Sequence, residues 1–267
     1  AWIGKDGDII KEKGLLGIRL VKTDRKDAFD GLAIESSQDL TRFASVPSNI
    51  QLENVAALEV LRVKIEGIPF TNLQLNGGRQ TLNGQVLTVK KEALTDLTPE
   101  LRVENLKALE KIFLKPGPFI QSDHPKIRDL VRDILKNDPD ADPLTRAEKL
   151  LNWVNTHIEK RPVLSLPDAL STLENKVGDC NEHAVLLAAL GRAAGIPTRI
   201  EAGLVYLEDR FYYHAWNLMY LGQWVTVDPV FGQLPADVSH LRFTTGSPER
   251  QLDIMGIIGK IKLTVLN

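Results

Sequence analysis

The chain of 267 residues contains one cysteine, Cys180, which follows Gly-Asp at the start of an apolar periodic stretch. Apolar residues at helical spacing predict a helix from this point until Gly195, which precedes Ile196-Pro197. Asp179 is the expected N-cap, so Cys180 should lie in the first helical turn. Unpaired backbone N–H groups and the positive end of the helix dipole favour thiolate over thiol there. We therefore expect a lowered pKa for the sulfur and part of an oxyanion hole.

A lone cysteine is also consistent with a small buried hydrophobe, so its partners decide between the two interpretations. A thiolate needs an imidazole beside it, and that imidazole needs an orienting acceptor. His214 and Asp228 suit these roles, because a predicted turn at 221–223 folds their two strands together. Taken singly, they would be a half-buried sheet histidine and the start of an Asp-Pro turn. Taken with Cys180, they predict a nucleophile, a base and an orienting carboxylate.

The other four histidines are weaker candidates for chemistry. His124 precedes a proline and His157 lies among charged residues, so surface or cap positions are expected for both. His183 lies three residues after Cys180, as a neighbour of the thiol or as a core histidine. A metal pair of these two residues is disfavoured because no further cysteine exists. His240 is expected to be structural, and no metal site is predicted.

The elements that must position these residues form two predicted domains. In residues 1–118, alternating patterns and the Asn83-Gly84 turn predict a mostly antiparallel, β-rich domain. A helical pattern at 100–115 follows, and the sequence KPGPF at 115–119 interrupts it. We place the domain boundary there.

Residues 119–267 open with two helical patterns and turn to strands after the helix at Cys180. Both helices show apolar residues at helical spacing, and the later segments are short, β-branched or aromatic. Helices followed by an antiparallel sheet predict an α+β fold with helices packed on the sheet.

Composition excludes several classes of partner. The formal net charge is −2 and the pI is about 6.3, so nothing points to nucleic acid. No apolar run approaches the roughly 18 residues that span a bilayer, and we expect a soluble chain. The chain begins at Ala1 rather than Met, so we expect a processed product. A periplasmic or secreted location would follow if an upstream signal was removed.

Three segments in the order Cys, His, Asp resemble the transglutaminase-like superfamily of papain-related cysteine enzymes, in its bacterial form. They are GDCNEHAVLLAALGRAAGIPTR around Cys180, HAW at 214–216 and WVTVDP at 224–229. The resemblance covers roughly residues 123–243 and implies a papain-like core. It implies Cys180 as nucleophile, His214 as general base and acid, and Asp228 as the residue that orients His214.

The resemblance also implies a reaction. The expected activity is acyl transfer from protein or peptide amides through a thioester, ending in hydrolysis or in transfer to an amine acceptor. No cofactor is required, and no calcium loop is found. Peptidase or amidase activity alone, or a non-catalytic interaction module, are the alternatives. Trp153, as a second oxyanion donor, and Tyr213 and Trp216 are candidates for contact with the substrate.

Overall fold

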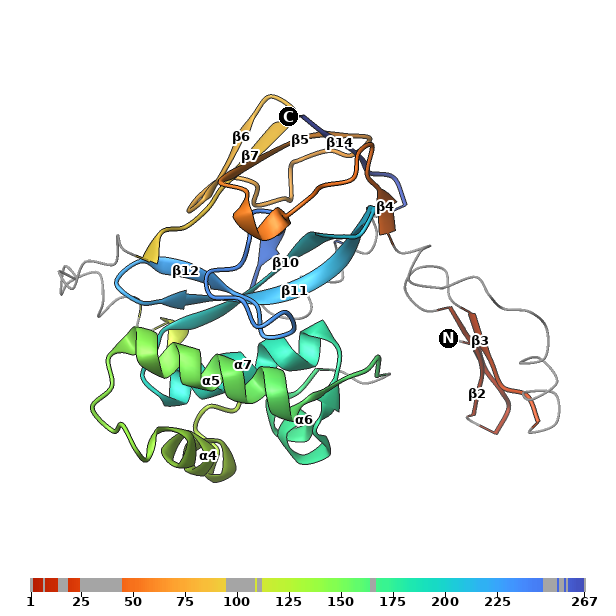
Figure 1. Ribbon diagram of the computed structural model, residues 1–267. Helices are drawn as coiled ribbons and strands as arrows, with labels where there is room; N and C mark the ends of the chain where they lie inside the picture. Colours follow the sequence, from red (N-terminus) through yellow and green to blue (C-terminus); the bar gives the residue numbers. More distant parts are fainter. Residues whose placement is uncertain are drawn as a thin grey trace.

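The computed structural model describes residues 2–6, 8–13, 19–24, 45–94, 109, 112–163, 167–246, 254, 257 and 259–266. Its centre is a five-stranded antiparallel sheet of order β12-β11-β10-β13, with β4 beside β11. Helices lie against one face of this sheet and a second sheet lies on the other side (Figure 1). The strands of the central sheet are β4 (Ser45–Pro47), β10 (Thr198–Leu207), β11 (Arg210–Tyr220), β12 (Trp224–Val227) and β13 (Leu241–Thr245).

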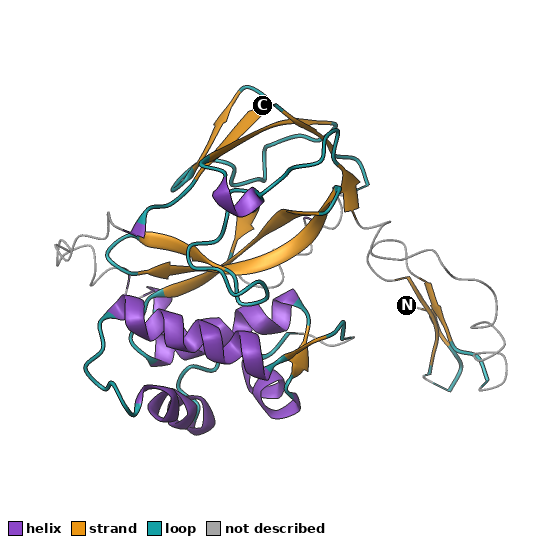
Figure 2. Cartoon of the chain, viewed as in Figure 1, coloured by secondary structure: helices purple, strands orange, loops and turns teal. Residues whose placement is uncertain are grey.

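The layer beside the central sheet consists of helices (Figure 2), and two of them begin at a capping residue followed by proline. Helix α4 (Pro125–Leu135) has His124 as its N-cap, and α5 (Pro143–His157) has Asp142, each followed by proline at the first helical position. Helix α6 (Ala169–Asn175) is capped by Asp168. The apolar faces predicted for α4 and α5 are the buried faces. Both helical predictions are therefore confirmed.

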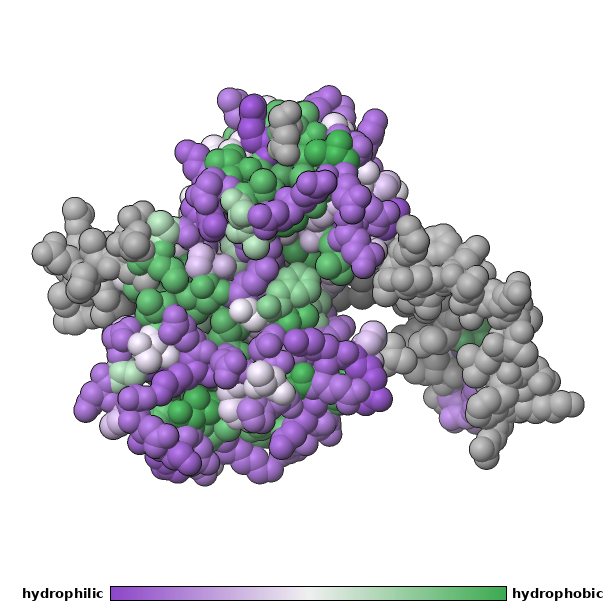
Figure 3. Space-filling model, viewed as in Figure 1, coloured by the Kyte–Doolittle hydropathy of each residue, from purple (hydrophilic) through white to green (hydrophobic). Residues whose placement is uncertain are grey.

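Helix α7 (Cys180–Ala193) is the interior helix of this layer. All its residues from 182 to 191 are buried, because α4, α5 and α6 cover one side while β10 and β11 cover the other. Gly195 adopts a φ of 79°, a conformation that favours glycine, and ends the helix as predicted. On the face shown in Figure 3, hydrophilic residues cover much of the outer surface of the helical layer. The helix is therefore buried from residue 182 onward, while its first two residues, Cys180 and Asn181, stay partly exposed.

The second sheet has the order β14-β5-β7-β6. The predicted Asn83-Gly84 hairpin joins β6 (Gln80–Asn83) to β7 (Val86–Lys90), as the alternating pattern requires. The side of β5 (Val60–Glu66) that carries Leu61, Val63 and Ile65 is fully buried. The predicted helix at 100–115 lies mostly outside the described residues. Smaller elements are β1 (Trp2–Ile3), β2 (Ile9–Lys13), β3 (Arg19–Val21), η3 (Val55–Ala57), β8 (Glu159–Lys160) and β9 (Val177–Gly178).

Strand pairing crosses the boundary predicted at residue 118. Strand β14 (Lys262–Val265), at the C-terminal end, pairs with β5 in the second sheet. Strand β4, from the first half, pairs with β11 in the central sheet. The division into residues 1–118 and 119–267 therefore does not separate the two sheets. Hydrogen-bonded edges join segments that lie more than 150 residues apart, and no local pattern announces such a pairing.

Buried polar side chains from the first half also reach the central sheet. Glu92 accepts hydrogen bonds from the backbone N–H and the hydroxyl of Thr226, at 3.0 Å and 3.2 Å. Arg79 lies 3.7 Å from Glu92 and donates to the carbonyl oxygen of Ala236. Burial raises the pKa of Glu92, although the Arg79 charge opposes this. These contacts connect the segments that flank the strands of the second sheet to β12, the strand that precedes Asp228.

Glu92→Ala is expected to lower the free energy of unfolding by about 3 kcal/mol, because it leaves the buried Arg79 guanidinium and the Thr226 N–H without their acceptor. Chemical denaturation measures the loss. Glu59→Ala is the matched control, since it removes an exposed carboxylate that pairs with Lys91. That change should cost under about 1 kcal/mol. Equal losses in the two variants would contradict a structural role for the buried pair.

Among the described residues, no helix is both long and apolar enough to cross a membrane.

Candidate active site

The start of α7 is held by a reciprocal cap, as the sequence predicts. Asp179 caps the backbone N–H groups of Asn181 and Glu182, and the Glu182 carboxyl accepts from the N–H of Asp179. These bonds satisfy three of the four N–H groups that a helix start leaves open. The fourth belongs to Cys180 itself. The cap therefore leaves the N–H of the cysteine as the donor available to an oxyanion.

Three contacts bring the first turns of α7 against one stretch of β11. The Tyr213 hydroxyl donates to Asn181 Oδ1 at 2.8 Å, and Asn217 Nδ2 donates to the carbonyl oxygen of Ala184 at 2.9 Å. Between them, the backbone N–H of Ala215 lies near enough to the Cys180 sulfur to favour its thiolate form. The thiol thus lies beside the residue that follows His214 in the strand.

Strand β11 has a gap along one edge at this place. Strand β4 pairs with its residues 210–212 and β12 pairs with its residues 217–220. Among the described strands, none pairs with residues 214–216 on that edge, so the Ala215 N–H faces the sulfur rather than a neighbouring strand.

The environment of Cys180 corrects the predicted lowering of its pKa. The side chain is partly exposed, yet protein atoms surround the sulfur, and this burial raises the pKa of the thiol well above its ordinary value. The charges of Asp179 and Asp228 raise it further, while the backbone N–H of Ala215 opposes them. Desolvation and nearby carboxylates outweigh the helix start. The surroundings therefore disfavour an isolated thiolate at this position.

Glu182 limits the negative charge near the sulfur. Burial, its hydrogen bond to Asp179 and the Asp179 charge raise the pKa of Glu182 to about 8. At neutral pH this carboxyl group therefore holds its proton. One carboxylate, rather than two, then faces the thiol from its own helix.

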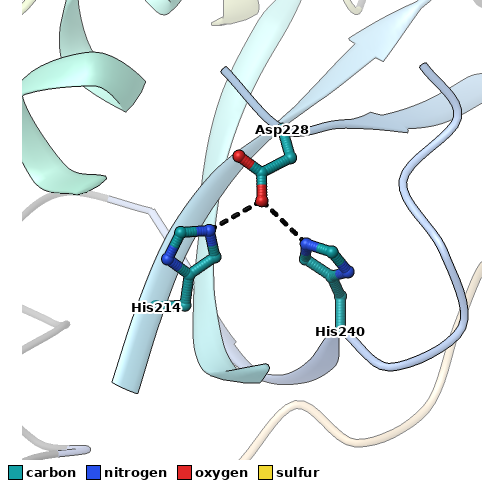
Figure 4. A group of neighbouring side chains, drawn as sticks. All are labelled: His214, Asp228 and His240. Atoms are coloured by element: carbon teal, nitrogen blue, oxygen red, sulfur yellow. Dashed lines mark hydrogen bonds and ion pairs between the residues drawn. The ribbon is translucent and has the colours of Figure 1, made fainter. Parts of the chain in front are cut away.

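His214 and Asp228 meet as the hairpin predicts. Strands β11 and β12 pair in antiparallel register around the turn at 221–223. His214 Nε2 lies 2.7 Å from Asp228 Oδ2, and both side chains are buried. In Figure 4 the other ring nitrogen of His214, Nδ1, points away from Asp228. An imidazole oriented in this way donates through Nε2 and keeps Nδ1 for proton exchange.

The Asp228 carboxylate accepts four hydrogen bonds. Oδ1 accepts from the backbone N–H groups of Val230 and Phe231, at 2.7 Å and 3.0 Å. Oδ2 accepts from His214 and, at 2.8 Å, from His240 Nε2. Burial alone would raise the pKa of Asp228, but the two histidines outweigh it and hold the pKa well below its usual range. The carboxylate therefore stays ionised.

His240 belongs to this cluster, which the sequence analysis did not find. It lies at the end of the loop before β13, fully buried, on the other side of Asp228 from His214 (Figure 4). Its position depends on the return of the chain from β12 to β13, which pairs with β10. The sequence around it carried no motif, so the expected structural role was the default.

The remaining candidates occupy different surroundings. Trp216 is fully buried, and its indole N–H donates to Glu201 at 3.2 Å, so its position offers packing against His214 rather than contact with a substrate. Tyr213 is half-buried beside the thiol. Trp153 is half-buried on α5 and stacks on His157, with ring centroids 4.6 Å apart. Roles for Tyr213 and Trp153 in substrate binding stay predictions.

Phe231 is an aromatic residue that the sequence analysis missed. Its ring stacks on the His214 imidazole with centroids 5.0 Å apart, and 39% of the residue is exposed. Its backbone N–H also binds Asp228. Phe231 therefore covers one face of the imidazole and presents an apolar surface to solvent.

The site does not suit a metal ion. Ligand atoms of His214, Asp228 and His240 lie within 4.8 Å of one another. However, the carboxylate oxygen is 2.7 Å and 2.8 Å from the two nitrogens, whereas tetrahedral ligands at about 2.1 Å from a metal lie roughly 3.4 Å apart. The spacing is that of hydrogen bonds. His183 is a core histidine whose Nδ1 lies 2.7 Å from the Asp179 carbonyl oxygen, so a metal pair with Cys180 is also disfavoured.

Helices packed on an antiparallel sheet, with the cysteine at a helix start and the histidine on a strand, define a papain-like α+β core. Residues 128–229 match the family model of the transglutaminase-like superfamily, which confirms the resemblance drawn from the motifs. No match was found among curated proteins.

Three solved structures that match this chain are from Cytophaga hutchinsonii and Pseudomonas aeruginosa. A candidate cysteine protease from Cytophaga hutchinsonii is 15% identical with a TM-score of 0.49, and the match covers 78% of this chain and 86% of that one. The periplasmic domain of TgpA from Pseudomonas aeruginosa is 15% identical with a TM-score of 0.41, covering 93% and 85%. The same domain bound to ethylmercury is 18% identical with a TM-score of 0.40, covering 72% and 75%.

Proposed function

We propose that this chain is a cysteine-dependent acyl-transfer enzyme that acts on protein or peptide amides through a thioester on Cys180. The observation that carries the proposal is the pairing of His214 with Asp228 at 2.7 Å, with the Asp228 charge acting on a thiol at the start of α7. A nucleophile, a base and an orienting carboxylate are the three parts that such chemistry needs.

In the first half of the cycle, the thiol proton passes to Nδ1 of His214 and the sulfur attacks the carbonyl carbon of an amide. The N–H of Cys180 donates to the developing oxyanion, since the cap occupies the neighbouring N–H groups. His214 then gives its proton to the amide nitrogen, and the carbon–nitrogen bond breaks. An amine leaves and a thioester on Cys180 remains.

In the second half, His214 takes a proton from an acceptor, which attacks the thioester carbonyl. Water gives hydrolysis, and a primary amine such as a lysine side chain gives transamidation. The sulfur leaves as a thiolate and recovers its proton from His214. The same three side chains serve both acceptors, and no cofactor takes part in either step.

The alternatives are a peptidase or amidase without amine transfer, and a non-catalytic interaction module with the same fold. The exposed ring of Phe231 over His214 favours an enzyme that binds an apolar group beside the reacting bond. Protein or peptide substrates, an amine acceptor and a periplasmic or secreted location all stay predictions.

Mass spectrometry tests the proposal. The protein is incubated with a glutamine-containing protein and an amine donor, and ligation, deamidation and cleavage are distinguished by mass. At least one of the three products is expected, together with an acyl adduct on Cys180 in quenched samples. Protein alkylated beforehand at its single cysteine is the control. Equal product from the alkylated protein, or no product over a panel of substrates, would remove the proposal.

A further inference from the structure

His240 has acceptors at both of its ring nitrogens. Nε2 lies 2.8 Å from Asp228 Oδ2. Nδ1 lies 3.2 Å from the carbonyl oxygen of Asp237 and 3.3 Å from its Oδ1. A carbonyl oxygen and an ionised carboxylate can only accept. Each nitrogen of His240 must therefore carry a hydrogen to satisfy its partner.

The hydrogen-bond partners of the Asp237 side chain are those of an ionised carboxylate. Its Oδ1 accepts from the backbone N–H and the hydroxyl of Ser239, and its Oδ2 accepts from Gln233 Nε2. Burial raises the pKa of Asp237, but the hydrogen bonds and charge of His240, with Ser239 and Gln233, hold it well below its usual range. This leaves no proton on Asp237 to donate to His240.

We propose that His240 is a buried imidazolium that bridges Asp228 and Asp237 and acts, through Asp228, as a positioning residue of the active site. Its charge lies between two carboxylates, and its ring centroid is 5.8 Å from that of His214. The positive charge of Arg79 also interacts with the carboxylate of Asp237. The rings of Trp216 and Phe231 meet His240 edge to face and keep water from it.

The hydrogen bonds outweigh the cost of burying the charge. Burial disfavours the protonated ring, yet the bonds and charges of Asp228 and Asp237 raise the pKa of His240 overall. Because the pKa of His240 is raised in the folded protein, its charge stabilises the fold. This stabilisation is fully present below the ordinary histidine pKa near 6.5 and is lost as pH rises through the raised pKa of His240.

This fixed cation limits how strongly Asp228 holds a proton on His214. Without it, the full carboxylate charge would face one imidazole and would stabilise the imidazolium that forms with the thiolate more strongly. With it, part of that charge is balanced, so His214 can return its proton to the leaving amine. This role in catalysis rests on the proposed function, whereas the protonation state of His240 does not.

The protonation state is tested by NMR of ¹⁵N-labelled protein at pH 8. His240 should show both ring nitrogens bearing hydrogen, and His240→Gln should remove that signal while His124→Asn, which keeps a helix cap, should not. If His240→Gln does not fold, Asp237→Asn serves instead and should shift the same signal. A neutral ring for His240 at pH 8 overturns the proposal.

The positioning role is tested by the pH dependence of Cys180 alkylation with iodoacetate, which needs no substrate. This anionic reagent reacts fastest while the imidazolium is present, so its rate declines at alkaline pH. In His240→Gln, which can still donate one hydrogen bond to Asp228, the decline should move up by about one pH unit. The His124→Asn protein should match the unmodified chain. An unmoved profile in folded His240→Gln shows that His240 is merely structural.

Discussion

Cys180→Ala and His214→Ala are each expected to lower kcat/KM by roughly 10⁴-fold or more, and the double variant should lose no more than either one. The thiol and the imidazole act as one unit in the proposed cycle, because burial and carboxylates raise the pKa of the isolated thiol. Removing either group leaves the other without its proton partner. Steady-state rates on the substrate found by mass spectrometry give the measurement.

Alkylation of the His214→Ala protein provides the accompanying control. Its thiol keeps the surroundings that raise the pKa of Cys180, so its thiolate should form only above the ordinary thiol range, beyond about pH 9. The unmodified protein, with its imidazole, should react at neutral pH. Rapid alkylation of His214→Ala at pH 7 would show that the helix start activates the sulfur by itself.

Asp228→Asn is expected to lower kcat/KM by roughly 10⁴-fold and the free energy of unfolding by about 3 kcal/mol. An asparagine oxygen could still accept from Val230 and Phe231. Its amide N–H₂ would then face the N–H groups of His214 and His240, where the carboxylate now accepts. Donors would meet donors, and His214 would lose the tautomer that keeps Nδ1 available.

The matched control for this change is Asp142→Asn. Asp142 caps α5 at the surface, and asparagine caps as well as aspartate, so under about 1 kcal/mol should be lost.

The stability contributed by Asp228 should depend on pH in a definite direction. Asp228 has a lowered pKa when folded, so its contribution is present above about pH 4 and is lost as pH falls toward the folded value. The stability gap between the two proteins should therefore narrow in acid. A stability difference that stays the same from neutral to acid pH would contradict an ionised carboxylate at Asp228.

The amino-acid sequence alone determined the parts of this protein that local chemistry decides. Asp179, the apolar period after it and Gly195 specify where α7 begins and ends, since capping and backbone conformation depend on neighbours in the chain. Alternation around residues 221–223 specifies the hairpin that joins His214 to Asp228. The contact between His214 and Asp228 follows from this hairpin, while the catalytic roles of Cys180, His214 and Asp228 stay predictions.

Other features of the protein depend on packing between distant segments, and only the tertiary structure revealed them. The pairing of β14 with β5 and of β4 with β11 joins segments from both sides of the boundary predicted at residue 118. The approach of His240 to Asp228 and the burial that raises the thiol pKa followed from the same folding. Desolvation and hydrogen bonds across a sheet depend on atoms brought together from distant segments, and a local sequence pattern carries no information about that surrounding protein.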